Sequence, residues 1–324
     1  MANDSDHVRK REQTSGRDLS HPPLPEPLTV GVYDNHTHLD PSTGSGRGIA
    51  TDGDDPLSWL DQLDRASSVG IRGVIQVGND LETSRWSAAM AAREPRMLAA
   101  VAIHPNEAPR YAADGTLDAA LAEIAELAAQ PRVVAVGETG LDFFRTGEDG
   151  RASQYHSFEA HIEIAKANNV AMQIHDRDAH DEVISTLRRV GAPERTVFHC
   201  FSGDAEMAKI CADNGWYLSF SGTVTFKNSV ALREALAITP RELLLVETDA
   251  PFLTPMPYRG RPNSPYLLPN TLRAMAEFLD TDVSMLAAQI SSNTELVYGR
   301  WDAQPLSGHH DAIDDNAQPI GGIA

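Results

Sequence analysis

The hydrophobic pattern becomes regular at Leu28, where short apolar runs rich in Val and Ile begin to alternate with longer stretches of mixed polarity. The short runs have the length and composition of buried β-strands, whereas the longer stretches carry apolar residues at i, i+3, i+4 and i+7, the period of an amphipathic helix. Eight runs predict strands, over residues 28–36, 71–78, 97–103, 132–138, 171–175, 195–200, 216–221 and 242–248.

The stretches between and after these runs predict helices with one apolar face each. The first face is closed by Pro131, the second precedes the fifth run, and two more follow the eighth run. In chain order the faces consist of Leu117, Leu121, Ile124 and Leu127, then Phe158, Ile162 and Ala165, then Met275, Phe278 and Leu279, and finally Val283, Leu286 and Ile290.

Eight strands that alternate with helices are the count of a (β/α)8 TIM barrel, an α/β fold whose strands are buried on both faces. A doubly wound open sheet is the alternative, and it requires a glycine-rich phosphate loop directly after the first strand. The glycine-rich stretch Gly44–Gly48 lies too far from the end of that strand and leads into no obvious helix. The pattern therefore favours the barrel.

Both ends of the chain lack this pattern. Residues 1–27 are polar and end in a proline-rich run, which predicts a disordered N-terminal extension, and residues 302–324 predict a disordered acidic tail. The barrel domain is then expected over residues 28–301. No apolar run is long enough to cross a bilayer and no secretory signal is present, which predicts a cytoplasmic protein without membrane contact.

The formal net charge of −19 argues against a protein that coats nucleic acid by electrostatic attraction alone. A local cluster of cations can still attract phosphate to a cleft. The two cysteines, Cys200 and Cys211, give no reason to expect a disulfide in a reducing compartment. Cys200 follows His199 directly, so on a strand it is expected to point away from that histidine and pack.

Candidate chemistry begins with His36 and His38, at the end of the first predicted strand. Residues i and i+2 of a strand point to the same side, so both imidazoles can bind one ion, although such pairs also occur by chance on exposed strands. The reacting groups of a barrel lie at the carboxyl ends of its strands, and reading only those positions gives a ring of imidazoles and carboxylates. Its members are His36, His38, His104, Glu138, His175, His199 and Asp249, and together they predict a metal site.

Nitrogen and oxygen ligands without a thiolate suit one or two divalent ions, Mg²⁺, Mn²⁺ or Zn²⁺, and argue against a closed structural zinc site. The set exceeds the need of one ion, and two ions could share Glu138, the arrangement that stabilises both the attacking and the leaving oxygen of a phosphoryl displacement. His104 is followed by Pro105 and is expected to bind substrate rather than metal, with loop packing as the alternative.

Six motifs resemble, in order and spacing, those of the TatD-type metal-dependent deoxyribonucleases, over about residues 31–300. They are Asp34-Asn35-His36-Thr37-His38, Ile103-His104-Pro105, Gly137-Glu138-Thr139-Gly140-Leu141-Asp142, His175-Asp176-Arg177-Asp178-Ala179, His199-Cys200-Phe201-Ser202-Gly203 and Glu247-Thr248-Asp249-Ala250-Pro251. One departure lies after the eighth strand, where the family usually reads Arg-Asn-Glu-Pro. This chain has Arg261-Pro262-Asn263-Ser264-Pro265, with Ser264 in place of the glutamate.

The resemblance implies a metallohydrolase barrel that hydrolyses DNA, often as an exonuclease from the 3′ end. The implied metal ligands are His36, His38, Glu138, His175, His199 and Asp249, and His104 would contact a substrate phosphate. Glu138 and Asp249 are the carboxylates placed to accept a proton from the attacking water, with ligation alone as the alternative. The candidate catalytic residues are therefore Glu138, Asp249 and His104.

Four arginines follow ligand motifs, on loops that should form the mouth of the barrel: Arg145, Arg177, Arg259 and Arg261. They would concentrate positive charge where a phosphate backbone enters, so we predict that they bind the substrate, DNA with single-stranded or frayed 3′ ends. Surface arginines are common, and the alternative for each is an exposed side chain without a role in binding.

Two other functions stay open from the sequence. A small-molecule hydrolase on the same scaffold could cleave an amide, a lactone, a phosphotriester or the aminoacyl ester of tRNA. Many such enzymes bridge their metals with a carboxylated lysine at the end of strand four, where this chain has Glu138. A binding protein or scaffold would have no physical need to keep a complete ligand set. The sequence does not indicate a protein partner.

Overall fold

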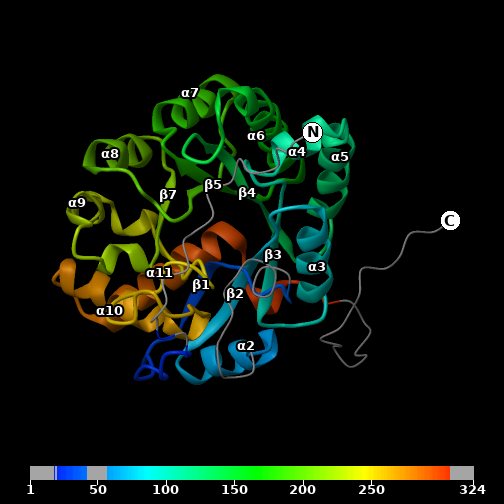
Figure 1. Ribbon diagram of the computed structural model, residues 1–324. Coiled ribbons are helices and arrows are strands. Elements are labelled where there is room, and N and C mark those ends of the chain that lie inside the picture. Colours follow the sequence, from blue (N-terminus) through cyan, green and yellow to red (C-terminus); the bar gives the residue numbers. More distant parts are fainter. Residues whose placement is uncertain (1–17, 19, 42–56, 307–324) are drawn as a thin grey trace.

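The computed structural model describes residues 18, 20–41 and 57–306, and these form a barrel of parallel strands surrounded by helices (Figure 1). The strands pair in chain order. They are β1 (Val32–Thr37), β2 (Ile71–Val77), β3 (Met97–Val101), β4 (Val133–Asp142), β5 (Ala171–Arg177), β6 (Thr196–Phe198), β7 (Tyr217–Phe220) and β8 (Leu244–Val246). A parallel bridge between Thr37 and Ala250 brings the chain after β8 beside β1. The predicted (β/α)8 barrel is confirmed.

Strand boundaries differ from the prediction where polar residues continue or end the pairing. β4 runs on to Asp142, four residues beyond the predicted end, because its last residues pair with β5 up to Arg177. β6 and β8 are short, since the chain leaves the sheet before His199 and Glu247. Glu138 therefore lies inside a strand, whereas His199 lies just beyond one.

The helices are α2 (Trp59–Ser68), α3 (Leu81–Ala91), α4 (Ala108–Ala113), α5 (Leu117–Ala128), α6 (Glu148–Asn168), α7 (His180–Val190), α8 (Ala205–Asp213), α9 (Val230–Ile238), α10 (Leu268–Phe278) and α11 (Val283–Tyr298). Short 3-10 helices are η1 (Gly222–Thr225), η2 (Arg241–Leu243), η3 (Pro265–Leu267) and η4 (Trp301–Ala303). The predicted apolar faces of α5 and α6 are buried, but Phe278 at the end of α10 is 41% exposed.

Apolar side chains pack on both sides of the strands. On β3, Met97 and Ala99 belong to the layer between strands and helices, whereas Leu98 belongs to the layer that fills the barrel. Trp301 stacks on Tyr33 within that inner layer, with ring centroids 4.2 Å apart. Each fully buried aliphatic or aromatic side chain stabilises the fold by roughly 1.5–3 kcal/mol. This core fixes the strand ends that carry the polar site.

The segment before β1 is held against the barrel by Arg261. Its guanidinium donates to the carbonyl oxygens of Ser20 and His21 at 3.0 and 2.9 Å, and to Ser20 Oγ at 2.9 Å. The buried Tyr266 hydroxyl donates to the Pro22 carbonyl at 2.6 Å. This part of the expected disordered extension thus makes specific contacts, which apolar periodicity does not reveal because its carbonyl groups make them.

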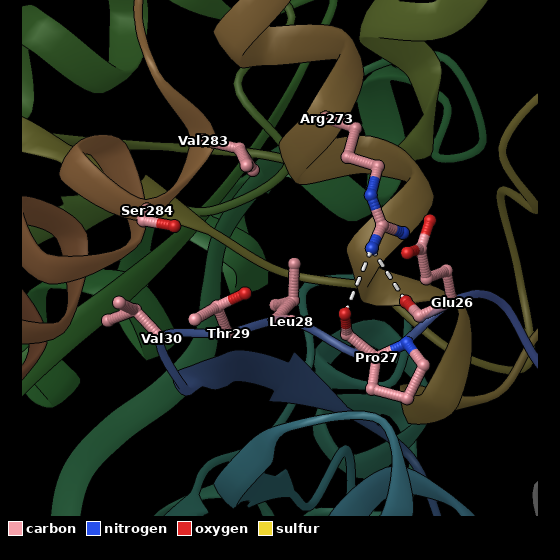
Figure 2. Close-up of a pocket in the computed structure, with 8 residues that line it drawn as sticks. All are labelled: Glu26, Pro27, Leu28, Thr29, Val30, Arg273, Val283 and Ser284. Atoms are coloured by element: carbon pink, nitrogen blue, oxygen red, sulfur yellow. Dashed lines mark hydrogen bonds between the residues drawn. The ribbon is translucent and has the colours of Figure 1, made fainter.

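Arg273 of α10 holds the end of the same segment (Figure 2). It donates to the Glu26 carbonyl at 2.6 Å and to the Pro27 carbonyl at 3.3 Å. The chain between Glu26 and Val30, together with Arg273 and the start of α11, lines a small cleft of about 170 Å³. Residues 20–27 therefore reach from the β8 loop to the outside of α10.

Three sequence features lie outside the described residues: positions 1–17, the glycine-rich stretch Gly44–Gly48, and positions 307–324. At the other end of the described chain, the Gln304 carbonyl accepts a hydrogen bond from the buried Arg132 at 3.1 Å. Among the helices described, none combines the length and apolarity that crossing a bilayer requires.

Candidate metal centre

The residues predicted as metal ligands, together with His104, which was predicted to bind substrate, converge at the carboxyl end of the barrel. β1 supplies His36, β4 supplies Glu138 and β5 supplies His175. The remaining members come from the turns that follow strands: His38 after β1, His104 after β3, His199 after β6 and Asp249 after β8. All are buried or nearly so, because each projects inwards from a strand end that the outer helices cover.

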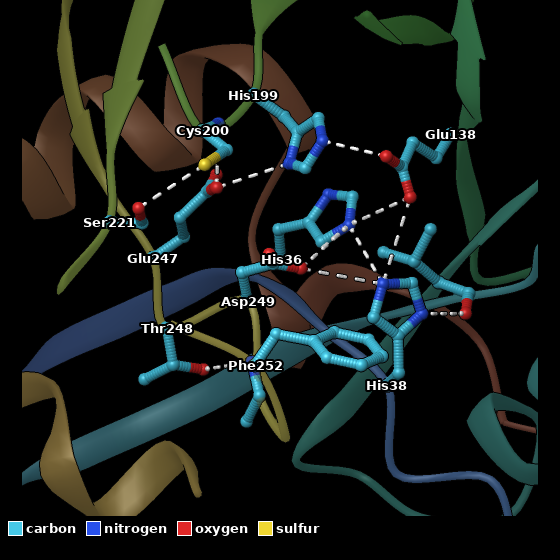
Figure 3. A network of polar contacts seen from close by, with 12 residues as sticks. His36, His38, Glu138, His199, Cys200, Ser221, Glu247, Thr248, Asp249 and Phe252 are labelled. Atoms are coloured by element: carbon cyan, nitrogen blue, oxygen red, sulfur yellow. Dashed lines mark hydrogen bonds and ion pairs between the residues drawn. The ribbon is translucent and has the colours of Figure 1, made fainter. Parts of the chain in front are cut away.

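The Glu138 carboxylate faces two groups of these side chains, and Figure 3 shows His36, His38 and Asp249 of the first group and His199 of the second. Its Oε2 lies 3.7 Å from His36 Nε2 and 3.8 Å from His38 Nε2. Its Oε1 lies 2.5 Å from His175 Nδ1 and 2.8 Å from His199 Nε2. Asp249 Oδ1 completes the first group, 3.9 Å from His36 and 3.6 Å from His38. One carboxylate thus faces two ligand sets with two different oxygens, and the sets overlap, because ligand atoms of His36, Glu138 and His199 also lie within 4.8 Å of one another.

Hydrogen bonds to the outer ring nitrogens fix which nitrogen is free to bind a metal. His36 Nδ1 donates to Gln173 Oε1 at 3.0 Å, and the amide of Gln173 is oriented by donating to the Asn35 carbonyl and to the Tyr298 hydroxyl. His38 Nδ1 donates to the Val77 carbonyl at 3.0 Å. With Nδ1 protonated, the Nε2 lone pairs of His36 and His38 both face the centre.

The second ligand group is oriented in the same way. His199 Nδ1 donates to Glu247 Oε1 at 3.1 Å, which leaves Nε2 for the centre. His175 is reversed: Nε2 donates to Asp142 Oδ2 at 3.2 Å, and Nδ1 faces Glu138. Each imidazole of both groups therefore offers one lone pair and has an acceptor behind it, the arrangement of metal-ligating histidines.

His104 is oriented for a different task. Its Nδ1 accepts the Asn106 backbone N–H at 3.0 Å, so the proton of the neutral ring is on Nε2, 3.3 Å from Glu138 Oε1. A protonated Nε2 is a donor and has no lone pair for a metal. His104, Glu138 and His175 lie close enough together to hold an ion. The tautomer nevertheless favours hydrogen bonding to an oxygen.

The close packing of histidines and carboxylates determines the protonation of the metal-free centre. Burial lowers the pKa of His175, but Glu138 and Asp142 outweigh it and raise the pKa to about 9. Burial likewise lowers the pKa of His199, and Glu138 and Glu247 raise it well above its ordinary value. Burial would raise the pKa of Glu138, yet the surrounding histidines hold it well below its usual range. Protons on the imidazoles thus occupy positions for which a divalent ion competes. The donor set fits such an ion.

Sequence analysis missed the groups behind the ligands, chiefly Gln173, Glu247 and Asp142. Asp142 also accepts from Asn106 Nδ2 at 2.9 Å and from the Arg145 N–H at 2.8 Å, so it joins the loops after β3 and β4. A signal was available for Gln173, because a polar residue inside an apolar strand is buried only when it is hydrogen bonded. Nothing comparable marked Asp142.

His161 of α6 links two strand ends of the centre. Its Nε2 accepts the Ile103 N–H at 3.2 Å, and its Nδ1 lies 2.8 Å from Thr139 Oγ1. Burial lowers its pKa to about 3, so the ring stays neutral. The ring thereby fixes the residues adjacent to His104 and Glu138.

The expectation that Cys200 lies on a strand was wrong. β6 ends at Phe198, and Cys200 has a φ of 42°, so the chain turns back. Its N–H donates to Glu247 Oε1 at 2.7 Å, and its Sγ lies 3.3 Å from Ser221 Oγ. Next to it opens a cavity of about 720 Å³ between the starts of α7, α8 and α9.

The four predicted substrate-binding arginines have different surroundings. Arg145 is exposed, and Arg177 and Arg259 lie over the rings of Phe144 and Phe226. Arg261 is engaged with residues before β1, as described above. The prediction that Arg261 binds substrate therefore conflicts with its contacts, because Nε and one terminal nitrogen donate to Ser20 and His21 and the other is 3.4 Å from Asp18 Oδ2.

Ser264, which stands where the related motif has glutamate, is buried. Its N–H donates to Asn263 Oδ1 at 2.9 Å, and its hydroxyl lacks a hydrogen-bond partner among the described residues. Asn263 in turn donates to the Thr248 carbonyl at 2.8 Å, next to Asp249. Asn263 therefore supports the loop that carries Asp249 without help from the side chain of Ser264.

Comparison with known proteins agrees with this geometry. A family model described as TatD related DNase matches residues 33–299. The uncharacterized metal-dependent hydrolase TatD of Mycobacterium tuberculosis is 45% identical over 272 residues, which cover 83% of this chain and 98% of that protein. The 3'-5' ssDNA/RNA exonuclease TatD of Escherichia fergusonii is 35% identical over 248 residues, covering 74% of this chain and 92% of that protein.

A solved structure gives the same result at the level of the fold. The crystal structure of YJJV, a TatD homologue from Escherichia coli K12, has a TM-score of 0.70 and 25% identity, and the match covers 82% of this chain and 98% of that one. Residues 33–299, which the family model matches, contain every ligand described above. The chain therefore belongs to the TatD related DNase family and is a metal-dependent hydrolase built on a (β/α)8 barrel.

Proposed function

We propose that this protein is a 3′–5′ exodeoxyribonuclease that prefers single-stranded ends. The observation that carries the proposal is the position of Glu138, whose two oxygens face two ligand sets. A pair of ions at such a centre suits phosphodiester cleavage, which develops charge on both the attacking and the leaving oxygen. The activity named for the Escherichia fergusonii relative supports the choice of substrate.

His36, His38 and Asp249 would hold one divalent ion, His175 and His199 would hold a second, and Glu138 would contribute to both. When bound, such ions would neutralise phosphate oxygens and lower the pKa of a water molecule. The number of ions is part of the proposal. The protein supplies the arrangement of ligands and the acceptors behind them.

The remaining steps belong to side chains of the protein. Asp249 is the better proton acceptor, because its side chain is 12% exposed whereas that of Glu138 is 6% exposed and faces imidazoles on both sides. The Asp249 N–H donates to the His36 carbonyl at 2.9 Å, which fixes the carboxylate beside the ligands. His104 Nε2–H would donate to a phosphate oxygen and so orient the scissile bond.

Access to the centre favours chain ends. The ligands project from strand ends and are buried, so a phosphate has to descend past the loops to reach them. An internal phosphate of a duplex is held too far from the floor by the second strand, whereas a single-stranded end can enter. Arg145, Arg177 and Arg259 on the surrounding loops would attract the backbone.

The test is a substrate panel with purified protein and added Mg²⁺ or Mn²⁺. We expect cleavage of single-stranded DNA oligonucleotides, slower cleavage of blunt duplex, and no comparable turnover of esters, amides or lactones. Glu138→Gln prepared in parallel controls for a contaminating nuclease. Turnover of a small ester or of an aminoacyl-tRNA, with oligonucleotides left intact, would instead assign a small-molecule or deacylase function to the same centre.

A further inference from the structure

Two phenylalanines at the mouth of the barrel each lie beneath an arginine. The Arg177 guanidinium carbon is 4.1 Å from the centroid of the Phe144 ring, and that of Arg259 is 4.2 Å from the centroid of the Phe226 ring. Phe144 is apolar but 45% exposed, so burying its ring against a ligand would be favourable. Both pairs lie at the carboxyl ends of strands: Phe144 follows β4 and Arg177 is the last residue of β5, whereas Phe226 follows β7 and Arg259 follows β8.

The loops that carry the pairs are held in place. The Phe143 N–H donates to the Arg177 carbonyl at 2.9 Å, and Arg145 N–H donates to Asp142, the acceptor of His175. Phe144 is therefore tied to the metal centre through a short chain of hydrogen bonds.

The second pair is fixed by side-chain donors. Arg233 of α9 donates to the carbonyl oxygens of Val224 and Phe226, at 3.3 and 2.8 Å. Thr225 Oγ1 accepts the Met256 N–H at 2.8 Å, which joins the loop after β7 to the loop that carries Arg259. Hydrogen bonds thus hold the loops of both phenylalanine–arginine pairs, the two platforms of the following proposal.

Resting on the proposed function, we propose that the Phe144–Arg177 and Phe226–Arg259 pairs bind unpaired nucleobases of the substrate strand. A base offers a flat apolar face and is followed by a phosphate, and a phenylalanine beside a guanidinium matches both features. Paired bases cover their faces with their neighbours, so only a single strand can use the two platforms. The pairs thereby determine specificity for unpaired strands, which charge alone does not.

The test compares cleavage of a single-stranded oligonucleotide with that of the same strand carrying one abasic residue, moved stepwise from the 3′ end. The wild-type protein should show a raised KM at two or more abasic positions, by roughly tenfold each. Phe144→Leu and Phe226→Leu keep apolar volume but remove the ring, so each should raise the KM for the normal strand by a similar factor. Each should also lose the discrimination at one abasic position while kcat stays close to normal.

The matched control is Leu296→Ala. Leu296 is an apolar side chain that is 68% exposed, but it lies on α11, outside the loops at the carboxyl ends of the strands. Its KM should be that of the wild type. Equal KM values for normal and abasic strands in the wild-type protein would overturn the inference without any variant. If no oligonucleotide is cleaved at all, the proposed nuclease function itself fails.

Discussion

Nε2 of His36 lies 3.2 Å from Nε2 of His38, and both rings have their other nitrogen committed to an acceptor. Two imidazole lone pairs at this distance repel each other unless a proton or a cation lies between them. Asp249 offsets the burial of His38 and raises its pKa, whereas burial lowers the pKa of His36. A divalent ion bound by the two nitrogens would supply this positive charge.

Metal dependence is the first expected outcome of this arrangement. Exhaustive chelation should abolish turnover, and added Mg²⁺ or Mn²⁺ should restore it, because the uncompensated lone pairs and carboxylates cannot activate water alone. Elemental analysis of the chelated protein provides the control. Full activity in protein shown to be metal-free would contradict the assignment of the centre.

Removal of charge from either carboxylate should reduce catalysis while the fold persists. Glu138→Gln and Asp249→Asn should each lower kcat by about 10²-fold or more. Circular dichroism and Tm should stay near wild type, and the exposed Asp213→Asn should change neither quantity. Near-normal kcat in one variant would place that carboxylate outside the chemistry.

The metal-free protein should lose stability as the pH rises above neutrality. The pKa of His175 is raised from 6.5 to about 9, so its contribution is fully present below pH 6.5 and is lost as the pH rises through 9. The effect is on the order of 1–3 kcal/mol. It is measured from Tm between pH 6 and pH 10 with and without His175→Gln. Parallel curves for the two proteins would show that His175 is not the group responsible.

Much of the fold and the ligand set was predictable from the sequence because both depend on apolar patterning. Several of the buried strands are followed closely by a histidine or a carboxylate, and in a barrel all such ends meet at one place. The sequence did not predict the roles of Gln173, Glu247 and Asp142, because these roles depend on which atoms lie behind an imidazole. That relation joins separate strands and leaves no period in the sequence.

The docking of the segment before β1 was not predicted for a related reason. Its carbonyl oxygens, rather than apolar side chains, make the contacts with Arg261 and Tyr266, so hydrophobic periodicity gave no sign of docking. Because these carbonyl contacts leave no hydrophobic pattern, the sequence also gave no sign that Arg261 is already hydrogen bonded. Arg259 differs from it only by two positions, yet it lies over Phe226 at the mouth.

Two truncations test whether the N-terminal segment stabilises the fold. From the sequence alone, neither truncation is expected to change Tm. Deletion of residues 1–17 should leave Tm unchanged, whereas deletion of residues 1–26 should lower it by several degrees, because hydrogen bonds to Arg261, Tyr266 and Arg273 are lost. Arg261→Ala should likewise lower Tm, and Arg259→Ala should instead raise KM. Identical Tm values for the two truncations would show that residues 20–26 contribute no stability.

The most direct test of the proposed function follows the products of a single strand labelled at its 5′ end, beside a covalently closed circle of the same sequence. Entry of a free 3′ end into the buried centre predicts a ladder that shortens stepwise from the 3′ end on the linear strand, and no cleavage of the circle. Arg259→Ala should yield the same ladder at a higher KM. Rapid cutting of the closed circle would contradict the account, because it would show that the metal centre reaches internal phosphates without an end.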